Sequence, residues 1–197
     1  MGRKKTHSRE EILAKAMDVF RETGFAGTTA DMLVDRIGVS RYSLYTDFDN
    51  LQDLFEAALE LYNDRIIDQR FGPLERPEAG LDEIFALLNF YGEAGNGPAS
   101  GRGCLLCNTA VEFGPNDPTG QDATQRYFKR LKSAFLNALS NGQRSGDLSA
   151  DADVREEADL LTAVVLGLFV MIRAKAPTSI IANAASSATA RIRAMST

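Results

Sequence analysis

Apolar residues recur at a helical period along most of the chain. The first such run extends from Ile12 to Phe20, where apolar side chains return every three or four residues. Ser8 precedes this run and Glu11 follows Ser8 by three residues, which is the spacing of a capping box. Gly24 comes directly after the run, and glycine is the residue most often found past the end of a helix. The pattern therefore predicts a first helix between Ser8 and Gly24.

Two short helices are predicted next. Thr28 and Thr29 are suitable caps for a helix whose apolar positions continue to Ile37. Gly38 follows that helix and indicates a turn, because glycine adopts backbone conformations that other residues avoid. Ser40 is then a suitable cap for a third helix.

Longer helices are expected over the remainder. Helical spacing continues from Leu51 toward Phe71, where Gly72 and Pro73 are expected to end the helix. Strand alternation is hard to find, so the predicted fold class is all-α. The remaining helices are expected at about 81–91, from Gly103 onward, at about 119–141, at about 153–175 and after Pro177, with breaks at Pro115, Asp117 and Pro118 and a closing pair at Asn141 and Gly142.

Composition narrows the class of protein. The 197 residues are 44% hydrophobic, enough to bury the core of one large domain or of a small domain fused to a larger one. The formal net charge is −5, so any nucleic-acid site must depend on a local patch. The longest apolar run, LLTAVVLGLFVMI, has about 13 residues, whereas a membrane span needs roughly 20. The start, MGRKKTHSREE, lacks the apolar region of a signal peptide, so we expect a cytoplasmic protein with no membrane partner.

The stretch GVSRYSLYTDF carries the main functional signal. Two capped helices joined by a glycine turn are typical of a helix-turn-helix, whose second helix lies in the major groove of DNA. Leu44 is expected to face the core, which leaves Arg41, Tyr42, Ser43 and Tyr45 facing outward. Arginine and serine can bind base edges, and tyrosine can donate to phosphate. The alternative is a helical hairpin that merely carries these residues on its outer face.

Residues 8 to 55 resemble the DNA-binding domain of the TetR family of transcriptional regulators. The resemblance rests on Gly-aromatic, Thr-Thr, Gly-Val-Ser and Leu-Tyr-x-x-Phe in GFAGTTADMLVDRIGVSRYSLYTDFDNLQDLF. It implies about nine helices, with an amino-terminal helix-turn-helix DNA-binding domain over 1–50 and a carboxy-terminal helical domain for ligand binding and dimerisation over 51–197. The implied function is a ligand-responsive homodimeric repressor. Its implied partners are double-stranded DNA with a palindromic operator and an unknown small-molecule inducer.

The resemblance also implies a set of DNA-binding residues. Asp47 and Leu51 depart from the family pattern, which usually has an aromatic residue or histidine at the first position and lysine at the second. Each departure is expected to weaken phosphate binding by about 1 kcal/mol. A basic arm of Arg3, Lys4, Lys5 and Arg9 could compensate in the minor groove, although a solubilising tail is the alternative. The implied DNA-binding residues are Thr29, Ser40, Arg41, Tyr42, Ser43, Tyr45 and Thr46.

Two cysteines lie three positions apart in GRGCLLCNTAVEF. If Gly103 starts a helix, Cys104 and Cys107 share one face, and the positive helix end together with Arg102 would lower the pKa of Cys104. This is the alternative of a redox- or electrophile-sensing repressor, and a Gly-Cys-Leu at this place resembles one branch of the family that includes such members. We favour the simpler interpretation, in which both cysteines are small buried apolar residues.

A ligand pocket is expected among the helices of the carboxy-terminal domain. Such pockets are mostly apolar, with a few polar groups that orient the ligand. The residues expected to line it are Phe85, Leu88, Cys104, Cys107, Asn108, Val111, Glu112, Tyr127 and Phe128.

Other function classes have little support in the sequence. His7 is the single histidine, so neither a zinc site nor a Ser-His-Asp set is expected, and we expect no metal and no cofactor. A thioredoxin-like enzyme would need strands around the Cys-x-x-Cys motif, so we expect no enzyme. A helical adaptor that binds only protein is the remaining alternative.

Overall fold

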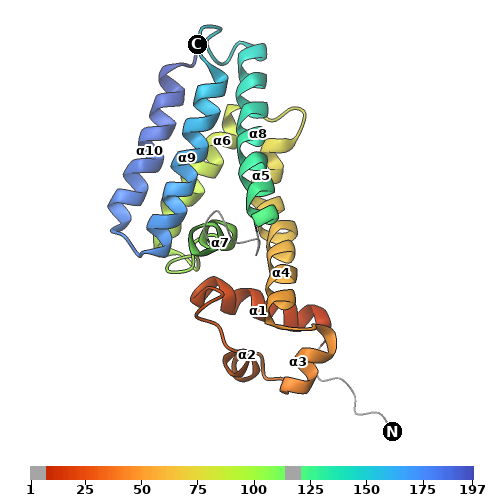
Figure 1. Ribbon diagram of the computed structural model, residues 1–197. Coiled ribbons are helices and arrows are strands. Elements are labelled where there is room, and N and C mark those ends of the chain that lie inside the picture. Colours follow the sequence, from red (N-terminus) through yellow and green to blue (C-terminus); the bar gives the residue numbers. More distant parts are fainter. Residues whose placement is uncertain (1–7, 114–120) are drawn as a thin grey trace.

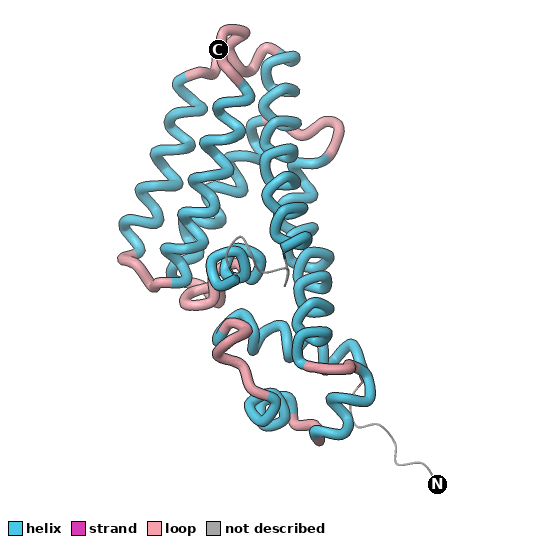
Figure 2. The backbone as a smooth tube through the Cα atoms, in the orientation of Figure 1, coloured by secondary structure: helices cyan, strands magenta, loops and turns pink. Residues whose placement is uncertain are grey.

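The computed structural model describes residues 8–113 and 121–197, and these residues contain helices but no strand (Figure 2). Counting α4, η1 and α5 as one continuous helix, and the short 3₁₀ turn η2 as the end of α6, the described residues form nine helices, in agreement with the expected fold (Figure 1). The elements are α1 (Arg9–Thr23), α2 (Ala30–Ile37), α3 (Arg41–Asp47), α4 (Leu51–Tyr62), η1 (Asn63–Ile67), α5 (Asp68–Glu75), α6 (Leu81–Glu93), η2 (Ala94–Asn96), α7 (Leu105–Phe113), α8 (Gln121–Ser145), α9 (Val154–Arg173) and α10 (Thr178–Ala194).

The amino-terminal helices begin and end where the sequence predicts. Ser8 and Glu11 form a complete capping box at the start of α1, and Gly24 follows its last residue. Of the two candidate caps, Thr29 is the one that accepts the backbone N–H at the start of α2, while the buried Thr28 hydroxyl donates to the Gly24 carbonyl. Ser40 caps α3 in the same way. These caps fix where each of the three helices begins.

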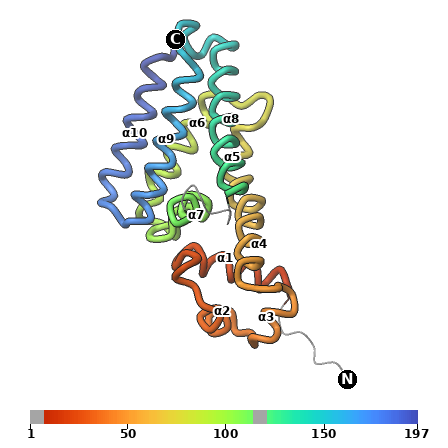
Figure 3. Tube along the Cα trace, in the orientation of Figure 1, coloured from red at the N-terminus to blue at the C-terminus, as the bar shows by residue number. Residues whose placement is uncertain are grey.

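The helix that starts at Leu51 does not end at Gly72 and Pro73 as predicted. It continues through a π turn, η1, and through both residues to Glu75. Phe71 and Leu74 are fully buried on either side of Pro73, and their burial offsets the hydrogen bond that proline removes. Figure 3 shows that this long helix connects α1–α3 to the larger domain.

The predicted end of α8 is also wrong. Asn141 and Gly142 lie inside the helix, which continues to Ser145 and is followed by Gly146 in a left-handed conformation. The Asn141 amide donates to the carbonyls of Pro77 and Ala79, 2.8 and 2.7 Å away, and so holds the loop after α5. A Cβ on Gly142 would lie 3.0 Å from the side chain of Leu81, so this glycine permits close packing of α8 against α6.

The carboxy-terminal domain is a bundle in which α6, α8, α9 and α10 lie side by side, while α7 lies between the bundle and α1 (Figure 1). One face of the apolar centre of α9 is buried, through Leu161, Val165, Leu168, Phe169 and Ile172, so the apolar run is buried on one side and not all round. Glu157 on α9 is buried and accepts two hydrogen bonds from Arg191 on α10, at 2.8 and 2.6 Å. Within the described ranges, no helix is long and apolar enough to cross a membrane.

Candidate DNA-binding surface and ligand cavity

The helix-turn-helix places its side chains as the pattern predicts. Leu44 and Phe48 are buried, with 0% and 2% of their surfaces exposed, and they hold α3 against α1 and α2. Tyr42 is 83% exposed and Tyr45 is 37% exposed on the outer side of α3. Two aromatic side chains that stand in solvent contribute little to the core and are available to a partner.

Arg41 has a contact that the sequence analysis missed. Its guanidinium forms an ion pair with Asp31 on α2, with 2.7 Å between the nitrogen and the carboxylate oxygen. Both side chains are exposed, so the pair is worth about 0–1 kcal/mol and breaks easily. Asp31 lies in the first turn of α2, and Arg41 lies in the first turn of α3, the next helix. Opposite charges in the first turns of two successive helices are the sequence signal that could have indicated the ion pair.

The hydroxyl groups expected to contact DNA also stabilise the helices. Ser40 Oγ accepts the Ser43 N–H at 3.0 Å and lies 2.9 Å from the Ser43 hydroxyl. Thr29 Oγ1 accepts the N–H of Met32 at 3.2 Å, and the Thr46 hydroxyl donates to the Tyr42 carbonyl at 2.7 Å. Ser40, Thr29 and Thr46 are exposed and Ser43 is half-buried, so these groups lie at the surface around α3.

The basic arm is only partly described. Arg3, Lys4, Lys5 and His7 lie outside the described residues. Arg9 is not an arm residue, because it is the first residue of α1 and its guanidinium lies 4.6 Å from the centre of the Phe48 ring.

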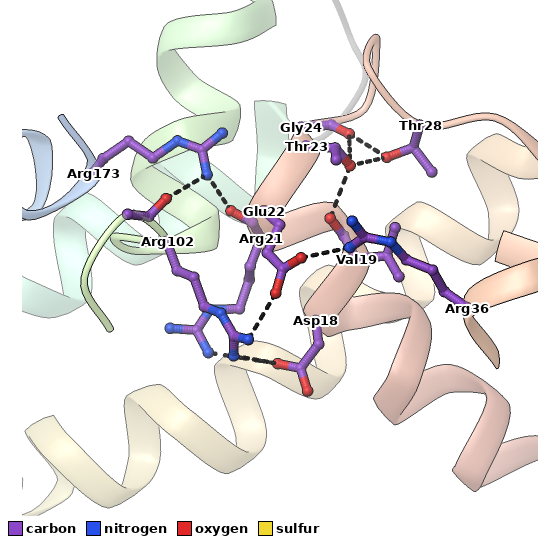
Figure 4. A network of polar contacts seen from close by, with 11 residues as sticks. Asp18, Val19, Arg21, Glu22, Thr23, Gly24, Thr28, Arg36, Arg102 and Arg173 are labelled. Carbon is purple, nitrogen blue, oxygen red and sulfur yellow. Dashed lines mark hydrogen bonds and ion pairs between the residues drawn. The ribbon is translucent and has the colours of Figure 1, made fainter. Parts of the chain in front are cut away.

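A polar network joins α1 to the carboxy-terminal domain (Figure 4). Arg102, from the loop before α7, contacts Glu22 at 2.7 Å and Asp18 at 3.7 Å. Glu22 also accepts a hydrogen bond from Arg36 on α2, and this bond is the main reason why the pKa of Glu22 is lowered. Glu22 therefore stays ionised at neutral pH and connects α2 to the loop before α7.

Arg21 forms a second part of the same network. Its guanidinium donates to the Gly103 carbonyl at 3.2 Å and lies 5.2 Å from the centre of the Tyr62 ring. The backbone carbonyl of Arg21 accepts a hydrogen bond from Arg173 at the end of α9, and Arg173 also donates to Gly101 at 3.1 Å (Figure 4). The last turn of α1 is thus bound both to the loop before α7 and to α9.

Glu112 provides the third connection between the two domains. Its carboxylate accepts the backbone N–H groups of Ala26 at 2.6 Å and of Phe25 at 3.0 Å, in the turn between α1 and α2. A Cβ on Gly24 would lie 2.8 Å from Glu112 Oε2, so the carboxylate fits because residue 24 is glycine. Glu112, predicted as a ligand-binding residue, here binds the DNA-binding domain.

The cysteines are buried, as the simpler interpretation predicts. Helix α7 begins at Leu105, so Cys104 lies just before it, and burial raises the pKa of the Cys104 thiol. Burial likewise raises the pKa of Cys107 to about 12. The expectation that the helix end and Arg102 lower the pKa of Cys104 is wrong, because desolvation outweighs the hydrogen bonds to the sulfur and Arg102 pairs with acidic side chains instead.

A cavity of about 350 Å³ lies between α4–η1–α5, α6, α9 and the loop before α7. None of the nine residues expected to bind a ligand lines it. No local sequence pattern could have indicated this lining, because its residues come from segments that are far apart in the sequence. The lining residues are Arg21, Tyr62, Ile66, Gln69, Arg70, Phe90, Tyr91, Glu93, Ala94, Gly97, Pro98, Ala99, Arg102, Gly103, Phe169 and Ile172.

The residues of the expected pocket are dispersed. Val111 is 75% exposed on α7, whereas Leu88 and Tyr127 are buried in the core. The Asn108 amide donates to the Arg102 carbonyl at 2.8 Å and so supports the loop beside the cavity. Phe128 packs against the core from a half-buried position.

Phe85 lines a separate groove between α6 and α10. Across 8–113 and 121–197, no three His, Cys, Asp or Glu side chains are close enough together to hold a metal ion.

Comparison with known families gives matches in both parts of the chain. The model of the family described as "Bacterial regulatory proteins, tetR family" matches residues 12–58. The model of the family described as "Tetracyclin repressor-like, C-terminal domain" matches residues 80–188. The HTH-type transcriptional regulator YezE of Bacillus subtilis (strain 168) is 30% identical over 172 residues, which cover 85% of this chain and 87% of YezE. The HTH-type transcriptional repressor ComR of Escherichia coli (strain K12) is 26% identical over 176 residues, covering 87% of this chain and 82% of ComR.

Solved structures share the fold. A cysteine mutant of the TetR family transcriptional regulator CifR, in complex with 26-bp double-strand operator DNA, has a TM-score of 0.83 and 25% identity, covering 96% of this chain and 98% of CifR. A TetR transcriptional regulator from Chloroflexus aurantiacus J-10-FL has a TM-score of 0.83 and 21% identity, covering 95% of each chain.

Proposed function

Because the chain belongs to the TetR family of transcriptional regulators, we propose that it is a homodimeric repressor that a small molecule releases from its operator. That it is a DNA-binding transcriptional regulator, and not an enzyme, follows from the family and from its repressor relatives. One observation carries the rest of the proposal. Arg21 and Arg102 line the cavity and also join α1 to the carboxy-terminal domain, so an occupant of the cavity touches the contact that orients the DNA-binding domain.

We propose that α3 enters the major groove of the operator. Arg41 would exchange Asp31 for a base edge, and the exposed Tyr42 and Tyr45 would reach base edges and phosphates. The operator would be palindromic, with two half-sites about 34 Å apart matching the two copies of α3.

An exposed stripe on α9 supports the homodimer. The stripe consists of Leu160, Ala163, the half-buried Gly167 and Val170 on α9, together with Ala174 directly after the helix; these positions are spaced alternately by three and four residues and so share one face. Leu160 is 39% exposed and Val170 is 50% exposed, and a Cβ built on Gly167 would meet nothing within 4 Å. An apolar stripe of this spacing with a central glycine would let a second copy of α9 approach closely.

The dimer has a direct test. Val170→Asp is expected to give a monomer in sedimentation at micromolar concentration, because a carboxylate would be buried without a partner in the interface. Operator affinity should fall with it, because a monomer binds only one half-site. Val111→Asp is the matched control, since Val111 is 75% exposed on α7, and it should leave the mass unchanged. A Val170→Asp protein that remains dimeric would place the interface elsewhere.

Release from DNA can be tested once an operator is known. The purified protein selects that operator from a library of random DNA duplexes. Ligand binding must favour the released state over the bound state, and each tenfold loss of operator affinity requires about 1.4 kcal/mol of that preference. Fluorescence anisotropy of the selected operator, titrated with candidate ligands, measures the loss directly. If no compound that fills the cavity changes operator affinity, the ligand-responsive part of the proposal fails.

A further inference from the structure

Arginines gather at the cavity, although the chain as a whole carries a net negative charge. Arg21, Arg70 and Arg102 line it, and Glu93 is the one acidic residue among the described residues of the lining. Asp18 and Glu22 pair with Arg21 and Arg102 from outside the lining, so Arg70 is the arginine without an ion pair among the described residues. The formal net charge of the chain is −5, so three arginines around one cavity run against the overall balance. The Glu93 carboxylate is exposed and accepts a hydrogen bond from Asn89, which places it at the rim.

Two of the arginines have unused hydrogen-bonding capacity. Arg70 lies 3.7 Å from the centre of the Phe90 ring, and among the described residues it has no carboxylate at ion-pair distance. The Arg21 side chain is only 13% exposed, and its Nε is buried with no hydrogen-bond partner in the part of the chain that the structure describes. A buried donor without an acceptor is unfavourable, so a shift of the Arg21 side chain that let an acceptor in the cavity reach this Nε would stabilise the protein.

The remaining walls are apolar and neutral. Phe90, Tyr91, Phe169 and Ile172 form much of the lining, together with Tyr62. Burial raises the pKa of Tyr62 and of Tyr91, so neither hydroxyl carries a negative charge that would repel an acid. Aromatic walls favour a flat or aliphatic body, and a volume of about 350 Å³ is in the range for a small ligand.

We propose that the cavity binds a small organic acid, whose carboxylate pairs with the arginines and whose apolar body lies against the aromatic walls. This inference rests on the proposed ligand response, because it names the ligand class of the same site. Arginine is suited to the role, since its guanidinium stays charged and binds a carboxylate through two parallel hydrogen bonds.

The same carboxylate would act on the contact between domains. Arg102 now pairs with Glu22 and Asp18, and Arg21 donates to the Gly103 carbonyl. A ligand carboxylate competes with these acceptors for the same guanidinium groups. Binding would therefore weaken the attachment of α1 to the loop before α7, and the two copies of α3 would lose their fixed separation.

The test uses matched acids and amides on the full-length protein. The probes are benzoate, phenylacetate and 4-phenylbutyrate, each beside its primary amide, with binding measured by isothermal titration calorimetry. At least one acid should bind tenfold or more tightly than its amide, which has the same shape but no charge. Equal binding of acid and amide, or no binding of any acid at millimolar concentration, would overturn the inference.

Two arginine variants locate the effect. Arg70→Gln should lower the affinity for the acid at least fivefold and leave the affinity for the amide within twofold, because Arg70 lines the cavity. Arg126→Gln is the control, since Arg126 pairs with Glu60 on the surface outside this cavity, and it should leave acid binding unchanged. Equal losses in the two variants would show that the acid binds by general charge attraction, against the inference.

Measuring operator affinity in the presence of each compound distinguishes failure of this inference from failure of the proposed function. An acid that binds without changing operator affinity would support the ligand class and contradict the ligand-responsive repressor. A neutral compound that binds the cavity and releases the operator, while acids do not bind, would support the repressor and contradict the ligand class.

Discussion

Replacing Glu112 by alanine should loosen the turn between α1 and α2. The Glu112 carboxylate accepts two backbone hydrogen bonds, at 2.6 Å from Ala26 and at 3.0 Å from Phe25, and within residues 8–113 and 121–197 no other group accepts from these two N–H groups. A hydrogen bond to a charged group is worth about 1.5–3 kcal/mol when shielded. Glu112 is exposed, so about 0.5–1 kcal/mol for each bond is the appropriate figure.

The two bonds together then stabilise the closed turn by about 1–2 kcal/mol, which is roughly a 5- to 30-fold preference over the open turn. Backbone hydrogen exchange measured by NMR reports this preference directly at Phe25 and Ala26. Both amides should exchange about 5- to 30-fold faster in Glu112→Ala. Glu56→Ala is the control, because Glu56 is exposed and accepts a hydrogen bond from Gln52 within its own helix.

Gly24→Ala gives a second measurement of the same contact. The added Cβ would lie 2.8 Å from Glu112 Oε2, and φ at residue 24 is +74°, which costs about 1–3 kcal/mol for a residue other than glycine. In the Glu112→Ala background the clash of the new Cβ with Glu112 is gone, while the backbone strain at residue 24 remains. The destabilisation of the double variant should therefore be smaller than the sum of the two single destabilisations by more than 0.5 kcal/mol. Unchanged exchange at Phe25 and Ala26 in Glu112→Ala, or strict additivity of the two changes, would refute this account of the turn.

Three other predictions concern the DNA-binding surface and the thiols. Arg41→Ala and Tyr45→Ala should each abolish specific operator binding without loss of helicity by circular dichroism, and Arg41 should account for about 1–3 kcal/mol if it reads a base; survival of specific binding in both would exclude α3 as the recognition helix. Asp31→Asn should tighten operator binding a few-fold in anisotropy, because it frees Arg41 and removes an anion near phosphate; weaker binding would mean that Asp31 orients Arg41 for DNA. Burial raises the pKa of Cys107 to about 12, so its thiol is almost wholly protonated at pH 7.5, and neither it nor the fully buried Cys104 should be alkylated within minutes in native protein by mass spectrometry; rapid native labelling would restore the redox-sensing alternative.

Local signals predicted the helix-turn-helix well. Ser8, Thr29 and Ser40 cap their helices because a cap depends on only a few neighbouring residues. Leu44 is buried because helical spacing places it on the inner face.

The misses share a physical cause, which is contact with distant segments. Pro73 did not end its helix because Phe71 and Leu74, on either side of it, are buried. Glu112 could not be assigned from the sequence, since its partners lie 86 and 87 positions away. The cavity was missed for the same reason, because its arginines come from α1, α5 and the loop before α7.

The π turn at Asn63–Ile67 determines how the long helix faces its neighbours. From Leu51 to Glu75 this helix is about 37 Å long at 1.5 Å per residue. A π turn contains one residue more than an α turn, which offsets the faces before and after it by about 100°. The first half can therefore bury one face against α1 while the second half buries a differently directed face against α8. Deleting a single residue from η1 would restore an α turn and leave the two faces in their present directions, whereas the same deletion in α4 or α5 would rotate the DNA-binding domain by about 100° about the helix axis. The extra residue of η1 is therefore the one that this helix can lose without turning α3.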